Sequence, residues 1–202
     1  MKIITNHEYI PFGPYLAKME IDLEFCKRLL EVGKTLTKKY NTELAGKIDG
    51  EYIYDLKKHP WIEEEFKVCV NTWITGWRKF SGISDFDPQI RLDPLWINFQ
   101  KAGEYNPIHL HPGCNLSFVL FLEIPEEMLK EKSKISGIPP GYLGFMYGEN
   151  IVLHGSVTHR VIQPKVGTLV MFPSILRHYV SHFTSNVIRT SVSGNISFGE
   201  VI

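Results

Sequence analysis

Residues 106–124 read NPIHLHPGCNLSFVLFLEI, and this stretch determines what kind of fold the chain can form. Its second half, Leu116–Ile124, is almost continuously apolar, which is typical of a strand buried on both faces. Its first half places His109-Leu110-His111 between two turn signals, Asn106-Pro107 and Pro112-Gly113. We therefore expect a β-structure with two histidines at the mouth of a strand, which is a usual place for a functional site.

The sequence on either side of this stretch predicts further strands. A period of two begins near residue 90, where Trp96, Asn98 and Gln100 alternate with Ile97 and Phe99. Glycine and proline separate the later apolar segments, so we expect several short strands in a sandwich or barrel. These later strands are predicted at residues 142–147, 157–162, 168–172, 178–183 and 187–198.

The first part of the chain predicts two amphipathic helices. Residues 22–39 carry an apolar stripe at helical spacing, with Asp22 as a plausible N-cap. Residues 60–79 carry a second stripe, begin with a proline at the first helical position and end before Ser81-Gly82. We expect both helices to pack on the sheet.

These patterns indicate a mainly β protein with N-terminal α-helices. We expect one domain over residues 1–202, in which residues 1–85 form a helical support and residues 90–202 form the β core. Within that core, residues 126–136 (EEMLKEKSKIS) interrupt the apolar pattern with charge. They suit a solvated surface excursion or a lid over a site.

Composition restricts the function classes and the compartment. Basic and acidic residues number 22 each, so overall charge does not favour binding to nucleic acid or to an anionic membrane. The three cysteines are Cys26, Cys69 and Cys114, which is an odd number with no CxxC motif and suits a reducing setting. No apolar stretch is long enough for a signal peptide or a membrane span. We expect a cytoplasmic protein, whose oligomeric state the sequence leaves open.

The histidine pair is a candidate metal site. In a strand, residues i and i+2 point to the same face about 6–7 Å apart, so the imidazoles of His109 and His111 can converge on one ion. Downstream, residues 167–178 read GTLVMFPSILRH, in which a short apolar strand ends at a Phe-Pro-Ser turn and His178 begins the next strand. Without these later residues, the pair fits solvated or core histidines as well.

Arg189 and Ser191 are candidates for holding an anion. They share one face of a predicted strand, so guanidinium and hydroxyl can contact the same carboxylate, for which arginine supplies a planar fork. If the barrel buries this arginine, it needs an anionic partner, and an anionic cosubstrate would provide one. A surface arginine paired with a glutamate is the alternative.

This order and spacing of motifs resembles the 2-oxoglutarate/Fe(II)-dependent oxygenases, most of all a subgroup from marine bacteria and their phages. The resemblance runs from about Leu95 to Phe198, roughly half of the chain. It rests on WINFQKAGEYNPIHLHPG, LSFVLFLEIP, GTLVMFPSILRH and VIRTSVSGNISF.

The resemblance implies a double-stranded β-helix (a cupin-like jelly roll) and an oxidoreductase. Such an enzyme uses Fe(II), 2-oxoglutarate as cosubstrate and O₂ to hydroxylate a small molecule or a side chain. The family's metal ligands fall on His109 and His178, and its carboxylate anchor falls on Arg189 and Ser191. Asn98 and Tyr105 are candidates for lining the same cavity.

One position departs from the family. The superfamily usually supplies a carboxylate as the second ligand, and here that position is His111. Three neutral imidazoles still bind Fe(II), but they leave the centre one negative charge short. His111 is either the third ligand or a neighbour that leaves a ligand position open.

Other functions remain compatible with the same residues. A three-histidine cupin-type dioxygenase would work without 2-oxoglutarate, with Arg189 holding the substrate instead. A non-enzymatic β-sandwich module for binding or structure, possibly viral, would carry the histidines incidentally. A zinc hydrolase is less well supported, because no general-base carboxylate lies near the histidine pair in sequence.

Overall fold

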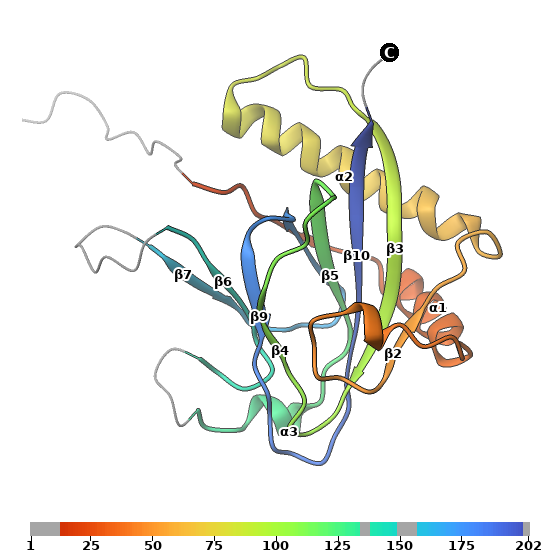
Figure 1. Ribbon diagram of the computed structural model, residues 1–202, viewed down its shortest axis with the longest axis vertical. Coiled ribbons are helices and arrows are strands. Elements are labelled where there is room, and N and C mark those ends of the chain that lie inside the picture. Colours follow the sequence, from red (N-terminus) through yellow and green to blue (C-terminus); the bar gives the residue numbers. More distant parts are fainter. Residues whose placement is uncertain (1–12, 134–137, 149–156, 200–202) are drawn as a thin grey trace, which may run out of the picture.

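The computed structural model describes residues 13–133, 138–148 and 157–199, and these form two antiparallel sheets that enclose a core (Figure 1). The larger sheet has six strands in the order β1-β8-β5-β10-β3-β2, and the smaller has four in the order β4-β9-β6-β7. The larger sheet contains β1 (Ala17–Glu20), β2 (Glu51–Ile53), β3 (Gln89–Gln100), β5 (Leu116–Glu123), β8 (Thr168–Pro173) and β10 (Arg189–Gly199). The smaller contains β4 (Asn106–His109), β6 (Leu143–Met146), β7 (His159–Ile162) and β9 (Arg177–Val180).

From β3 onward the chain passes back and forth between the two sheets. β3, β5, β8 and β10 lie in the larger sheet, while β4, β6, β7 and β9 lie in the smaller one. This winding of eight strands into two facing sheets is the expected double-stranded β-helix, so the predicted fold class is confirmed.

The buried run predicted after the histidine pair is β5, a strand in the middle of the larger sheet. Its residues are buried from Leu116 to Leu122 because both faces are covered. Phe118 points to the helices, where it stacks on Phe66 with ring centroids 4.5 Å apart. Phe121 points to the other side, into the cluster shared with the smaller sheet. The strand therefore separates two cores.

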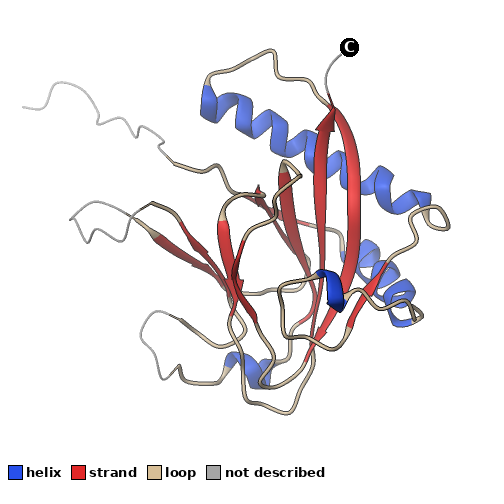
Figure 2. Ribbon diagram, in the orientation of Figure 1, coloured by secondary structure: helices blue, strands red, loops and turns tan. Residues whose placement is uncertain are grey.

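Both predicted helices form, and they cover the outer face of the larger sheet (Figure 2). α1 (Leu23–Lys34) starts where Asp22 accepts a hydrogen bond from the Phe25 amide, as expected. The helix was expected to reach residue 39 but ends five residues earlier. Thr35 caps it, and Lys39 already forms a β-bridge with Tyr52 of β2. α2 (Pro60–Ser81) ends at Gly82, whose φ of 75° suits glycine.

The first part of the chain also contributes strands, which the sequence did not predict. β1 pairs with β8 and β2 pairs with β3, so residues before 85 extend the larger sheet as well as supporting it. These strands have four and three residues, too few for a periodic signal, and their partners lie far away in sequence. A single 3-10 turn, η1 (Asn41–Glu43), precedes β2.

The charged excursion after β5 is anchored to the body of the protein where the structure describes it. It begins as α3 (Glu126–Leu129), whose Met128 is fully buried. The Glu131 carboxylate then accepts hydrogen bonds from the backbone amides of Thr184 and Ser185. Residues 134–136 of the possible lid lie outside the described residues.

The contact between α2 and the sheet predicts a large loss of stability on truncation. Replacing Phe66 by alanine removes the ring stacked on Phe118, and we expect the free energy of unfolding to fall by about 3–5 kcal/mol. Urea denaturation followed by circular dichroism measures this change. Val68 on the same helix is 62% exposed, so Val68→Ala should change stability by less than about 0.5 kcal/mol. Equal losses in the two variants would contradict this account of the core.

Candidate active site

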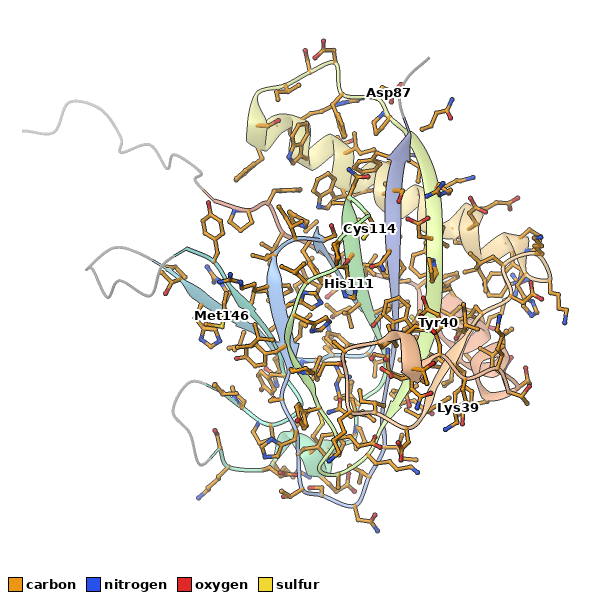
Figure 3. All side chains as sticks on the ribbon, viewed as in Figure 1. Lys39, Tyr40, Asp87, His111, Cys114 and Met146 are labelled. Carbon is orange, nitrogen blue, oxygen red and sulfur yellow. The ribbon has the colours of Figure 1, made fainter. Side chains whose placement is uncertain are left out.

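All of the predicted site residues except Tyr105 line one cavity between the two sheets. His109 and His178 come from the smaller sheet, while Arg189, Ser191 and Asn98 come from the larger. Figure 3 places His111 near the centre of the molecule, in the region between the sheets. The cavity is lined by polar groups from β2, β3, β4, β5, β9 and β10 and by apolar groups such as Val119, Leu143, Phe172 and Val180.

Strand pairing brings the three histidines together. His109 on β4 and His178 on β9 are directly opposite each other in the antiparallel pair. His111 follows two residues after His109, and its backbone amide donates to the Ser174 carbonyl, which fixes the turn after β4. One nitrogen from each ring lies within 4.8 Å of the other two, so the three could hold one metal ion. Within the described part of the chain, this is the one such group of histidine, cysteine and acidic residues.

Hydrogen bonds determine which ring nitrogens are free for a metal. Nδ1 of His109 donates to the Pro107 carbonyl at 2.7 Å, and Nδ1 of His178 donates to the Leu176 carbonyl at 2.8 Å. A carbonyl oxygen only accepts, so both rings carry their proton on Nδ1 and keep the Nε2 lone pair. Such carbonyl partners typically fix the orientation of metal-binding histidines.

The surroundings keep all three imidazoles neutral. Burial lowers the pKa of His178 to about 3, and the neighbouring His109 adds to the shift. Burial together with His109 lowers the pKa of His111 to about 4, and burial also lowers the pKa of His109. At neutral pH the rings are therefore uncharged, with one nitrogen free of a proton, which is the form that binds a metal. Phe172 packs edge-on against His178, with ring centroids 4.7 Å apart.

Arg189 is a buried cation without an anionic partner among the described residues. Its side chain is 1% exposed, and Nη1 donates to Gln100 Oε1 at 3.2 Å and to Ser191 Oγ at 3.1 Å. Its Nε and Nη2 atoms are buried and make no hydrogen bond. Burial lowers the pKa of Arg189 only to about 10, so the group stays charged at neutral pH. Two free donors on a planar cation fit a carboxylate, which is the group at the far end of 2-oxoglutarate.

The two candidate lining residues differ. Asn98 lines the cavity, but its amide is occupied within the protein, since Oδ1 accepts from Trp96 and Nδ2 donates to the Ser191 carbonyl and to Ser193. Tyr105 is 40% exposed, pairs with Lys47 and is not among the residues that line the cavity. Asn98 therefore orients its neighbours, and Tyr105 lies outside the site.

Sequence reasoning missed Glu51 and Gln100. Gln100 holds Arg189, and its position on the polar face of β3 was visible in the alternation. Glu51 lies in β2, faces Asn98 in register and lines the cavity, although no pattern in a three-residue strand could have placed it there. Burial raises the pKa of Glu51 to about 8, and the nearby Glu104 carboxylate adds to the shift.

A comparison with protein families matches this region of the chain. A family model described as "Putative 2OG-Fe(II) oxygenase" matches residues 94–195, a range that includes the three histidines, Arg189 and Ser191. The resemblance to 2-oxoglutarate/Fe(II) oxygenases is thereby confirmed, while the closer likeness to those of marine bacteria and phages stays a prediction. A search of curated proteins finds no match.

Solved structures share the fold at low sequence identity. The viral collagen prolyl hydroxylase of Paramecium Bursaria Chlorella virus-1, in its 2-oxoglutarate complex, aligns with a TM-score of 0.59 and 13% identity over 93% of this chain and 98% of that one. An oxidoreductase of the 2OG-Fe(II) oxygenase family from Burkholderia pseudomallei gives 0.57 and 16%, over 90% and 84%. HygX from Streptomyces hygroscopicus, with nickel and 2-oxoglutarate bound, gives 0.55 and 10%, over 90% and 82%.

The raised pKa of Glu51 predicts that this residue makes the protein less stable as pH rises, the opposite of the usual effect of a paired carboxylate. The folded protein holds the Glu51 proton more tightly than the unfolded chain does. Proton binding by Glu51 therefore contributes to the free energy of unfolding, fully below about pH 4, and this contribution is lost as pH rises to about 8. Between pH 5 and 8.5, the wild type should therefore lose more than about 1.4 kcal/mol relative to Glu51→Gln, the equivalent of one pKa unit. Urea denaturation at both pH values measures this difference.

Other titrating groups, the three histidines included, are shared by the two proteins and cancel in the comparison. Glu43→Gln removes a carboxylate that is exposed and eight residues away, so this variant should follow the wild type at both pH values. Parallel profiles for wild type and Glu51→Gln would show that Glu51 is ionised in the free protein.

Proposed function

Since this chain belongs to the 2-oxoglutarate/Fe(II)-dependent oxygenases, we propose that His109, His111 and His178 bind its iron and that Arg189 and Ser191 bind its cosubstrate. The family match covers half of the chain and makes the protein an oxidoreductase that uses Fe(II), 2-oxoglutarate and O₂. The assignment of each residue is our inference from the geometry of the cavity.

The unpaired guanidinium of Arg189 is the observation that carries this proposal. A fully buried charge without a counterion costs several kcal/mol, and proteins keep such a group where a ligand neutralises it. The free donors of Arg189 lie in the same cavity as the histidine triad. A ligand with a carboxylate at one end and a metal-chelating group at the other would use both, and 2-oxoglutarate is such a molecule.

The protein's part in the reaction is to hold the metal and the cosubstrate, to orient the substrate and to exclude water. Bound iron and 2-oxoglutarate supply the redox chemistry, in which O₂ is activated as the cosubstrate is oxidised to succinate and CO₂. The Nε2 atoms of His109 and His178 would be free to hold the iron, because their Nδ1 protons are donated to backbone carbonyls. Gln100 and Ser191 hold the guanidinium in place, and Phe172 and Val119 keep water from the cavity wall.

The fit does not depend on a ligand carboxylate. No acidic oxygen belongs to the cluster formed by the histidines in the described residues, and Glu51 lies outside it. We propose that His111 takes the ligand position that most of the superfamily fills with aspartate or glutamate. Three neutral ligands leave the metal with its full double positive charge, which favours binding of a dianionic cosubstrate.

We further infer the setting in which the enzyme works. The described part of the chain contains no helix that is long and apolar enough to cross a membrane. All three cysteines are free thiols, which supports a reducing, cytoplasmic environment. The substrate is a small molecule or a side chain, and the neutral formal charge gives no support for nucleic acid. Residues 1–202 are proposed to act as one domain.

Anaerobic binding of Fe(II) and 2-oxoglutarate tests the site without knowledge of the substrate. We expect the weak visible charge-transfer band of the iron–2-oxoglutarate chelate in the wild type. His178→Ala should abolish the band by removing a metal ligand. Arg189→Met should keep the iron but weaken 2-oxoglutarate binding by about 30-fold or more, because a buried charge pair loses one partner. Titration of the band with 2-oxoglutarate measures this affinity.

Arg160→Met is the matched control, since Arg160 is an exposed residue of β7 away from the cavity. It should leave the titration unchanged. Bound iron without a band in the wild type would favour a dioxygenase that binds its substrate without 2-oxoglutarate. If Arg189→Met bound 2-oxoglutarate as tightly as the wild type, Arg189 would not be a cosubstrate-binding residue.

Replacement of His111 distinguishes a ligand from a neighbour of the metal. If His111 is a ligand, His111→Asp should keep iron and the band, because a carboxylate restores the usual ligand set. His111→Leu should then lower iron affinity beyond the roughly 10–100-fold loss that follows replacement of a residue that only supports a ligand. Equilibrium dialysis against Fe(II) gives both values, and similar small losses in the two variants would show that His111 is no ligand.

A further inference from the structure

Glu51 is the acidic side chain of the cavity, and no described residue hydrogen-bonds to its carboxyl group. It lies on β2 opposite Asn98 of β3 and is only 1% exposed. Its Oε1 and Oε2 atoms are both buried without a hydrogen bond. Of the residues that line the cavity, Glu51 and Arg189 are the two with a formal charge at neutral pH in free solution.

Neither Asn98 on β3 nor Arg189 on β10, which both line the cavity, hydrogen-bonds to Glu51. Asn98 uses its amide on Trp96, Ser191 and Ser193. Arg189 donates to Gln100 and Ser191 and makes no ion pair with Glu51. Leaving a buried carboxyl unsatisfied costs about 1–3 kcal/mol or more. A protein keeps such a group where a ligand supplies the missing partner, and a cationic group on the ligand would favour the ionised form of Glu51, just as an anionic group suits Arg189.

The surroundings of Glu51 present acceptor oxygens. A Cβ at Gly46 would overlap Asn106 Oδ1 and would lie 3.6 Å from Glu51 Oε1. Asn106 Oδ1 therefore occupies the space that a side chain at residue 46 would need, and Glu51 Oε1 lies close to the same point. Both Asn106 and Glu51 line the cavity that contains the histidines. An ammonium group brings three donors and no acceptor, so it can satisfy both oxygens at once.

We propose that Glu51, together with Asn106, binds a protonated amine of the primary substrate. The substrate is then an amine-bearing molecule or side chain that extends from the Glu51–Asn106 pair toward the histidine triad. This inference rests on the proposed function, since it presumes that the triad holds iron and that Arg189 is occupied by 2-oxoglutarate. Glu51 acts as a specificity residue and does not bind the metal, because its oxygens lie outside the histidine cluster.

Isothermal titration calorimetry of the anaerobic Fe(II)–2-oxoglutarate holoenzyme with n-butylammonium tests the proposal. We expect 1-butanol, which has the same carbon chain without the charge, to bind at least about tenfold more weakly. Glu51→Gln should weaken n-butylammonium binding by about 30-fold or more, as expected when one partner of a buried charge pair is removed. It should leave 1-butanol binding and the charge-transfer band unchanged. Glu43→Gln, which changes an exposed carboxylate, should behave as the wild type.

Several outcomes would overturn the proposal. n-Butylammonium that binds no better than 1-butanol, or equally well to Glu51→Gln, would exclude an amine site at Glu51. Loss of iron in Glu51→Gln would assign the carboxyl to the metal instead. A missing band in the wild type defeats the proposed function, whereas an intact band without amine preference defeats this inference alone. Glu51→Leu, tested in parallel, guards against an effect peculiar to the glutamine side chain.

A peptide arm of the same experiment separates the two sources of an amine. Acetyl-Gly-Gly-Lys-Gly-Gly-amide carries the n-butylammonium group on a peptide backbone. Tighter binding of this peptide than of n-butylammonium would support a protein side chain as the substrate. Weaker binding would support a free small amine that must enter the cavity whole. A peptide whose binding does not respond to Glu51→Gln would contradict the proposal.

Discussion

The packing of α1 and α2 on the outer face of the larger sheet is the interaction on which the rest of the structure depends. It creates the larger of the two cores, in which Phe66, Phe118 and Leu95 are buried together with many other apolar residues of the helices and the sheet. The apolar core between the two sheets is smaller. Because the helices bury the outer face of β3, β5 and β10, the stability of the domain does not require an apolar inner face on these strands. That inner face can therefore carry Asn98, Gln100, Arg189 and Ser191.

Two of the polar side chains that line the cavity depart from a general rule of protein interiors. Buried polar groups are normally hydrogen-bonded, and Asn98 follows the rule with a complete set of partners. Arg189 and Glu51 break it, since each keeps buried polar atoms without a partner among the described residues. Buried polar groups without partners lower stability, and natural proteins retain such losses mainly where binding or catalysis needs them. The two exceptions therefore point to two ligand groups of opposite charge in one cavity.

Local patterns in the sequence predicted much of the fold and part of the site. The continuous apolar run of β5, the stripes of α1 and α2 and the alternation along β3 each depend on near neighbours, and each element is present, although α1 is shorter than expected. The order of the motifs and the family resemblance also predicted that His109, His178 and Arg189 belong to one site. What could not be predicted depends on strand pairing across long distances, such as the register of His109 with His178. The place of Glu51 depends in the same way on the pairing of β2 with β3.

A histidine at position 111 costs less to bury in this cavity than the carboxylate that the superfamily usually has there. A carboxylate beside His109 and His178 would bury an anion among these rings, and before metal binding the neutral imidazoles next to it would offset none of its charge. A neutral imidazole costs far less to bury, and its lowered pKa keeps it ready for a metal at neutral pH. The strands can therefore assemble the triad in the metal-free protein, with His178 and His109 already oriented by backbone carbonyls. If these histidines bind the metal as proposed, a site formed in advance would lose less conformational entropy on binding, which would offset part of the affinity that a charged ligand contributes.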